Sequence, residues 1–276
     1  MVSVGLRGLN VAWRGSSFLR EMAHAAEEAE VESLWVSDHV VLPSAPQLHE
    51  QARTQGEFVD AFASLGYLAA VTKRVRLGAA VVVLPLRHPL LVAKAAAGVA
   101  ALSGGRLLLG VGCGWLETEF RALGIGYADR GPRTDEYLAA LRAAWGNSED
   151  GFAGRYAAWR GTAAVAPRPP SGEVPIVVGG ETGAALERAL RHGDGFFPTG
   201  PGRLALAEAF RRQRPGTPIT LPVLPDGADL RDAVRTADRV VLTVRPGAPR
   251  ADFGVADPAE VAPAVARVHD MAAGPQ

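Results

Sequence analysis

The feature that most constrains the fold of this chain is a regular alternation of short apolar runs with longer segments of helical character. Continuous apolar runs of four to eight residues are typical of parallel strands that are buried on both faces. The runs are Val2–Leu9, Ser33–Val36, Val75–Val83, Leu107–Val111, Ile176–Val178, Gly195–Pro198, Pro218–Val223 and Arg239–Val244. The helical candidates that follow them are Ser17–Glu30, Phe58–Thr72, Pro89–Leu102, Arg133–Trp145, Thr182–Arg191, Arg203–Arg212, Leu230–Thr236 and Pro258–Met271.

This alternation predicts an α/β protein. Because right-handed crossovers place each parallel strand beside the one before it, eight β/α units close into a (β/α)8 TIM barrel. An open doubly wound sheet is the alternative that the same pattern allows. The length of 276 residues is usual for one barrel, so we expect residues 1–276 to form a single domain. The last two units are short and weakly marked.

Two stretches do not fit the repeat and predict loops or small hairpins, residues 43–57 and residues 146–172. The first follows the second strand, at the end of the barrel where barrel enzymes keep their chemistry, and long loops there often act as lids. The second joins a helix to a strand, so we expect it to start from the opposite end.

Charge and composition narrow the range of partners. The chain has 29 Lys plus Arg and 29 Asp plus Glu, and this balance argues against binding to nucleic acid or to an anionic membrane. The most apolar stretch, residues 77–86, is too short to cross a membrane, and no signal peptide is evident. Cys113 is the one cysteine, and the histidines show no ligand spacing, so we expect no disulfide and no metal. A small-molecule substrate and a cytoplasmic location are expected.

Five segments fall at strand ends that meet at the same rim of the predicted barrel. They are Asn10, Asp38-His39, Ala79-Ala80-Val81, Gly112-Cys113-Gly114-Trp115 and Gly179-Gly180-Glu181-Thr182. His39 is a candidate general acid or base, since histidine titrates near neutral pH, and Asp38 is a candidate ligand for a hydrogen-bond donor. The structural alternative is an Asp-His pair that caps the following loop.

The two glycine-rich segments suggest places where a ligand approaches the backbone. Gly179 and Gly180 run from a strand into a helix, where backbone N–H groups favour a phosphate; a tight strand-to-helix turn is the alternative. The run Gly110-Val111-Gly112-Cys113-Gly114 is not a dinucleotide fingerprint, because no helix follows at once. We interpret it as a strand end without side chains, against which a flat ring can lie. Cys113 then lines the site, and Trp115 forms either an aromatic wall or part of the core.

Long parts of the chain resemble the bacterial luciferase-like monooxygenase family, and in particular its deazaflavin-dependent (coenzyme F420) oxidoreductase branch. The resemblance is carried, in order, by LWVSDHVVLP, VRLGAAVVVLPLRHPLLVAKAAAGVAALSGGRLLLGVGCGWLETEFRALG, RGPRTDEYLAALRAAW, PIVVGG and GDGFFP. It covers roughly residues 33–200, and the C-terminal third looks shortened relative to most members.

The resemblance implies a (β/α)8 barrel that binds a flavin or deazaflavin at the carboxyl rim. By this likeness Asp38 would bind the ring or ribityl part, and His39 would lie near the reacting carbon as a proton donor. The family's non-prolyl cis peptide behind the ring would fall between Ala80 and Val81. Cys113 and Gly114 would line the cofactor, and Gly179, Gly180, Glu181 and Thr182 would form its phosphate cradle. Asn10 and Trp115 would face the substrate.

One departure bears on the activity. Trp115 stands where the family's sugar-phosphate dehydrogenases have an acid–base glutamate, so that activity is unsupported. The resemblance favours hydride transfer from reduced coenzyme F420 to a small organic substrate. An FMN-dependent monooxygenase that uses oxygen is the alternative, and a cofactor-binding relative without turnover is a third hypothesis. Family members commonly form dimers, so a homodimer is expected.

Overall fold

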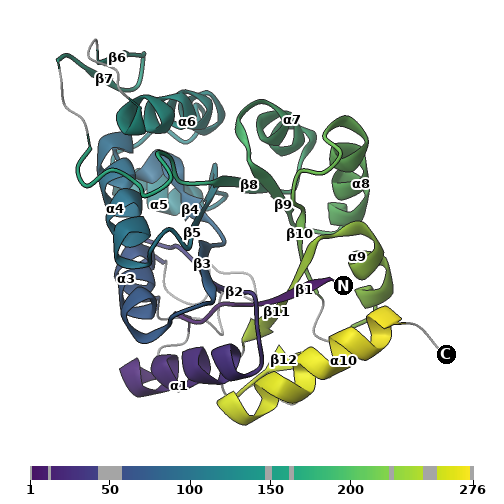
Figure 1. Ribbon diagram of the computed structural model, residues 1–276. Helices are drawn as coiled ribbons and strands as arrows, with labels where there is room; N and C mark the ends of the chain where they lie inside the picture. The colour runs from purple at the N-terminus through teal and green to yellow at the C-terminus, as the bar shows by residue number, and fades with distance from the viewer. Residues whose placement is uncertain are drawn as a thin grey trace.

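The computed structural model describes residues 2–11, 14–42, 58–146, 151–161, 165–223, 227–244 and 254–273. Figure 1 looks along the axis of a ring of strands that is surrounded by helices. Helices α1 and α10, from the two ends of the chain, lie side by side on one edge of this ring. The prediction of a lid within residues 43–57 lies outside the described residues.

The strands form a parallel sheet in the order β10-β11-β1-β2-β3-β5-β8-β9. Their bounds are β1 (Ser3–Arg7), β2 (Ser33–Val36), β3 (Arg76–Ala79), β5 (Leu107–Gly112), β8 (Ile176–Gly180), β9 (Gly195–Pro198), β10 (Thr220–Pro222) and β11 (Arg239–Val244). A single parallel bridge between Phe196 and Ile219 joins β9 to the start of β10 and completes the ring. The predicted (β/α)8 barrel is therefore confirmed.

The helices cover the outside of the ring. They are α1 (Gly15–Glu28), α3 (Ala61–Val71), α4 (Pro89–Leu102), α5 (Glu117–Ala122), α6 (Arg130–Trp145), α7 (Gly183–His192), α8 (Arg203–Gln213), α9 (Leu230–Thr236) and α10 (Val261–Ala273), with short 3-10 turns η2 (Leu84–Leu86) and η3 (Pro258–Glu260). In α1 the buried residues Leu19, Met22, Ala23 and Ala26 follow the helical period. Pro89 starts α4, and Gly104 and Gly105, which follow its C-cap, have the positive φ that favours glycine there.

The structure refines the sequence-based prediction in several places. The third apolar run is split into β3 and β4 (Val82–Val83), which pairs with β5. The short helix α5 was not predicted, and α6 starts at Arg130 instead of Arg133. The 146–172 stretch contains a small hairpin, β6 (Phe152–Ala153) with β7 (Ala158–Trp159), as expected of it. A further short strand, β12 (Gly254–Val255), pairs with β11.

Large side chains fill the inside of the ring, so the barrel is not a pore. Trp35, Leu108, Val177, Phe197 and Val241 form a buried cluster that draws on five strands. The rings of Trp35 and Phe197 meet edge to face with centroids 5.4 Å apart. A Cβ atom on Gly78 would lie 2.3 Å from the Trp35 ring, so the neighbouring strand needs glycine there. This buried cluster fills the interior below the carboxyl rim, so a ligand can bind only at the rim.

Among the described helices, none combines the length and the apolar character that a membrane crossing requires.

Candidate functional site

Two groups of residues lie at the carboxyl ends of the strands β2 to β8, and we name them by their chemistry. The histidine side consists of Asp38, His39, Arg87, Trp115 and Glu119, at the ends of β2, β4 and β5. The glycine side consists of Gly179, Gly180, Glu181, Thr182 and Gly183, where β8 turns into α7. Val81 lies between the two sides, because a Cβ atom added to Gly112 of β5 or to Gly179 of β8 would lie 2.7 Å from its side chain.

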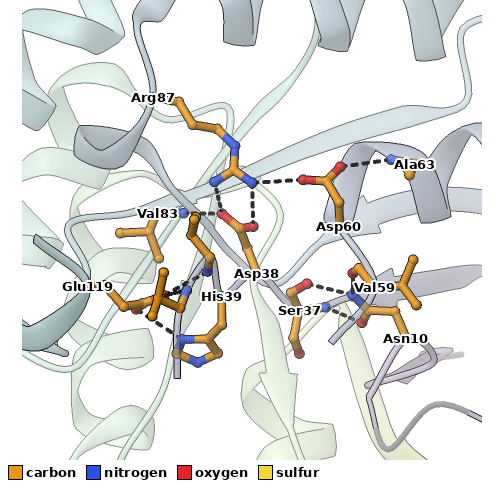
Figure 2. A network of polar contacts seen from close by, with 12 residues as sticks. Asn10, Ser37, Asp38, His39, Val59, Asp60, Ala63, Val83, Arg87 and Glu119 are labelled. Carbon is orange, nitrogen blue, oxygen red and sulfur yellow. Dashed lines mark hydrogen bonds and ion pairs between the residues drawn. The ribbon is translucent and has the colours of Figure 1, made fainter. Parts of the chain in front are cut away.

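Asp38 is the centre of an ion-pair network (Figure 2). Its two carboxylate oxygens accept hydrogen bonds from Nη1 and Nη2 of Arg87 at 2.9 and 3.0 Å, and the amide of Val83 donates a third at 3.0 Å. Arg87 Nη2 also contacts Asp60 at 2.9 Å, and Asp60 caps α3 by accepting from the Ala63 amide. The network ties the end of β2 to β4 and to the start of α3.

These contacts show a structural role for Asp38 beside the expected one. The residue is 4% exposed, and both of its oxygens already accept hydrogen bonds from the protein. Burial raises the pKa of the Asp38 carboxyl, and the nearby Arg87 guanidinium and the Val83 amide counteract part of that rise. These contacts give Asp38 a supporting role at the rim, and the cofactor contact that the resemblance implied stays a prediction.

Asn10 has a similar supporting role. Its side chain is fully buried, its amide nitrogen donates to the carbonyls of Ser37 and Val59, and its amide oxygen accepts from the Ser37 amide. Every hydrogen of the amide group is used, as Figure 2 shows. Asn10 therefore joins the ends of β1 and β2 to the segment before α3, and its place in a substrate pocket stays a prediction.

His39 is paired with a buried carboxylate that the sequence did not reveal. Its Nδ1 atom lies 3.0 Å from Oε2 of Glu119, a residue of α5 that is 1% exposed. The other oxygen, Oε1, accepts from the amides of Val40 at 2.7 Å and Val41 at 3.3 Å. Glu119 thus holds three consecutive residues that follow β2 (Figure 2).

Apolar side chains surround the His39 ring. Phe58 meets it edge to face with centroids 4.9 Å apart, and Trp115 does so at 6.1 Å. Trp115 is 53% exposed, and Val40 and Val41 are 42% and 43% exposed. Of the two readings of Trp115, the aromatic wall is therefore favoured over core packing. An exposed apolar rim of this kind is suited to a ligand with an apolar face.

Helix α5 explains why Glu119 was missed. The sequence pattern predicts that the chain passes from the Gly112–Trp115 turn directly to a helix at Arg133. The buried residues Leu116 and Phe120 are four positions apart, which is one helical turn, and this spacing was the available signal. No local pattern, however, shows that the glutamate between them points at a residue of another strand.

The floor between the two sides is the backbone around Ala80 and Val81. The peptide bond that joins them is cis, as the resemblance implied, and both residues are half-buried. A Cβ atom on Gly110 would lie 1.7 Å from the Ala79 carbonyl oxygen, and one on Gly112 would lie 2.7 Å from the Val81 side chain. These two glycines make room for the kinked segment, so the space that they leave is filled by protein instead of by a flat ring.

Cys113 and Gly114 follow at the end of the same strand. Cys113 is a half-buried free cysteine. Gly114 has a φ of +78°, and a Cβ atom there would lie 2.5 Å from Val83 and 3.0 Å from Phe120. Glycine at position 114 is thus needed both for the turn and for the packing of α5 against β4.

The glycine side ends in an open helix terminus. Thr182 occupies the N-cap position of α7 but makes no side-chain cap hydrogen bond, and Glu181, Thr182 and Gly183 are exposed. The Glu181 carboxylate turns to Thr199, 3.3 Å from its hydroxyl, and packs on Gly200. The first N–H groups of a helix attract anions, so this terminus can hold a phosphate. In the described part of the chain no cluster of His, Cys, Asp and Glu could hold a metal ion.

This combination of an eight-stranded barrel, an apolar-rimmed histidine and an open helix terminus agrees with the sequence comparisons. Residues 12–216 match the family model described as luciferase-like monooxygenase. The chain belongs to this family, whose members are oxidoreductases and monooxygenases.

Individual relatives bear names from both chemical branches. An F420-dependent glucose-6-phosphate dehydrogenase of Beutenbergia cavernae is 36% identical over 75% of this chain, and the match spans 57% of that relative's length. A monooxygenase from Streptomyces bottropensis has a similar structure, with a TM-score of 0.67 and 24% identity, over 85% of this chain and 78% of the other. An F420-dependent secondary alcohol dehydrogenase, solved with an F420-acetone adduct, gives a TM-score of 0.67 at 22% identity, over 85% and 72%. The two structural matches establish the fold.

Proposed function

We propose that this protein is an oxidoreductase in which reduced coenzyme F420 transfers hydride to a small organic substrate at the carboxyl rim. The observation that carries the proposal is the half-exposed floor at Ala80 and Val81, with a buried-glutamate-bound histidine on one side and an open helix terminus on the other. The F420-dependent relatives support the choice of cofactor.

The residues present fit a tricyclic cofactor with a phosphate. Ala80 and Val81 offer a half-exposed backbone surface that glycines on β5 and β8 allow to come close. On the glycine side, the uncapped N-terminus of α7 offers backbone N–H donors to a phosphate, and the exposed Thr182 hydroxyl is placed to add a contact. We include Gly179 and Gly180, whose lack of side chains keeps this turn narrow, in the same cradle.

His39 is the proposed proton donor. When bound, the reduced deazaflavin supplies the hydride, and a proton must then reach the reduced group of the substrate. The His39 ring is held at Nδ1 by Glu119, so Nε2 is the atom that can carry and release this proton. The edge-to-face contacts with Phe58 and Trp115 give it a partly apolar surrounding.

An FMN-dependent monooxygenase is the second candidate, because the family model and the Streptomyces bottropensis neighbour are described as monooxygenases. In that case the same floor and helix terminus would hold FMN, whose phosphate has the same requirement for donors. A homodimer remains a prediction, to be tested by sedimentation of the purified protein.

The test is a titration of the purified protein with coenzyme F420 and with FMN, followed by turnover assays with each reduced cofactor. We expect micromolar binding of F420, weaker binding of FMN, and oxidation of reduced F420 by added carbonyl or enone compounds without oxygen. Oxygen-dependent turnover with reduced FMN alone would replace the proposal with the second candidate. Tight binding of either cofactor without any turnover would instead indicate a cofactor-binding relative.

A further inference from the structure

We propose that Glu119 is a positioning residue that fixes His39 as the Nδ1–H tautomer and directs Nε2 to the rim. The inference rests on the proposed function for its catalytic consequence, but the tautomer itself can be measured without any cofactor. Neither the sequence motifs nor the family resemblance assigned a role to Glu119.

The burial of Glu119 needs an explanation. The residue is 1% exposed, next to the fully buried Phe120, and a buried carboxylate is unfavourable unless donors surround it. The donors are the amides of Val40 and Val41 on Oε1 and the His39 ring on Oε2. All of them come from one short segment of the β2 end, so the position of this segment and the charge of Glu119 depend on each other.

The two carboxylate oxygens of Glu119 have different partners, and this difference determines the tautomer of His39. An ionised carboxylate only accepts hydrogen bonds, and the two amide donors on Oε1 favour this form of Glu119. We infer that the Nδ1 atom of His39, 3.0 Å from Oε2, carries the hydrogen of this contact. In the neutral ring Nε2 then has a free lone pair, and in the protonated ring it carries the second hydrogen. His39 can thus gain and lose a proton at Nε2 while its ring orientation stays fixed.

The surroundings of His39 leave Nε2 available. Within the part of the chain that the structure describes, Glu119 is the one hydrogen-bond partner of the ring. Phe58 and Trp115 make edge-to-face ring contacts with it, which orient the ring without binding Nε2. The His39 side chain is 15% exposed, so a substrate can reach it at the rim.

If Glu119 only held the Val40 and Val41 amides, its replacement by Gln would leave the His39 tautomer unchanged. The positioning role makes a different prediction. In Glu119→Gln the amide oxygen would stay on these two N–H donors, because an NH2 group there would meet two donors. The NH2 group would then face Nδ1 and donate to it. The backbone contacts would survive, while His39 would switch to the Nε2–H tautomer.

The experiment compares the whole protein with three variants: Glu119→Gln, Glu117→Gln as an exposed control on the same helix, and His39→Gln to identify the ring signals. Long-range 1H–15N spectra of the histidine rings, recorded at alkaline pH without cofactor, report which ring nitrogen carries hydrogen. We expect protonated Nδ1 in the wild type and in Glu117→Gln, and protonated Nε2 in Glu119→Gln.

The kinetic readout uses the cofactor that the titration identifies. We expect Glu119→Gln to lower kcat by about 100-fold, the lower end of the range for a lost general acid, with the affinity for the cofactor unchanged. A wild-type Nε2–H ring, or a ring signal that does not change in Glu119→Gln, would overturn the inference. A changed tautomer with wild-type kcat would overturn the positioning role. If the wild type shows no turnover with either reduced cofactor, the proposed function fails. The ring spectra still decide whether Glu119 fixes the tautomer of His39.

Discussion

The two sides of the rim are built in opposite ways. On the histidine side nearly every polar group is used by another part of the protein, as the contacts of Asp38 with Arg87 and of Glu119 with His39 show. On the glycine side Glu181, Thr182 and Gly183 are exposed, and the helix terminus has no side-chain cap. The comparison shows how a site can hold one reactive atom rigidly while it leaves backbone donors free for a ligand.

The largest expected effect is a loss of stability caused by a substitution on the histidine side. Asp38→Ala removes a buried carboxylate and leaves Arg87, whose side chain is 19% exposed, with Asp60 alone. Because the loss of one member of a buried pair is costly, we expect the free energy of unfolding to fall by about 3 kcal/mol, measured by urea denaturation. The affinity of the folded Asp38→Ala variant for the cofactor then shows whether Asp38 only supports the rim or also contacts the cofactor. A stable Asp38→Ala protein with much weaker cofactor binding would restore the family role of this residue.

The next effect contrasts two glycines on the glycine side. A Cβ atom on Gly179 would lie 2.7 Å from the Val81 side chain, whereas one on Gly183 would meet nothing within 4 Å. We expect Gly179→Ala to lower the free energy of unfolding by about 2 kcal/mol through overpacking, and Gly183→Ala to raise it by about 0.5 kcal/mol. Equal effects of the two substitutions would show that the floor is less tightly packed than the structure indicates.

A smaller effect tests the helix terminus as the anion site. Gly183→Asp and Gly183→Asn have the same shape and differ in charge at the first residue of α7. Because a negative charge there favours the helix but repels a phosphate, we expect Gly183→Asp to be at least as stable as Gly183→Asn. Its affinity for the cofactor should be about ten-fold weaker, about 1.4 kcal/mol, and should recover in high salt. Equal affinities of the two variants would place the phosphate elsewhere.

The smallest effect concerns the exposed end of the Asp38 network. Burial acts to raise the pKa of Asp60, but the Ala63 amide and Arg87 outweigh it, so the pKa lies below its usual value. Ionised Asp60 therefore stabilises the folded protein above the unfolded pKa of about 4, and this contribution is lost as the pH falls through the lower folded value. Since half of the Asp60 side chain is exposed, we expect Asp60→Asn to cost less than about 1 kcal/mol at pH 7.

Thermal unfolding of Asp60→Asn and of the wild type between pH 3 and pH 7 measures this contribution. The difference between the two proteins should shrink as the solution is acidified. A difference that grows in acid would contradict the lowered pKa.

Much of the barrel was predictable because its signals are local. The apolar runs Gly195–Pro198 and Arg239–Val244 coincide with β9 and β11, and Pro89–Leu102 coincides with α4. The kink in the third run was implied by the family resemblance, and its physical setting appeared only when Gly110 and Gly112 were seen to face it. Helix α5 was missed, since two buried residues in a six-residue helix give too little periodicity.

The sequence by itself determined the strands, most helices, the family and the position of His39 at a strand end, because each depends on neighbouring residues or on the order of motifs. Only the tertiary structure decided which side chains act together. Glu119 lies 80 residues from His39, and Arg87 lies 49 residues from Asp38. Such contacts arise from the curvature of a closed sheet, which brings the ends of different strands to one rim, and no spacing along the chain encodes them.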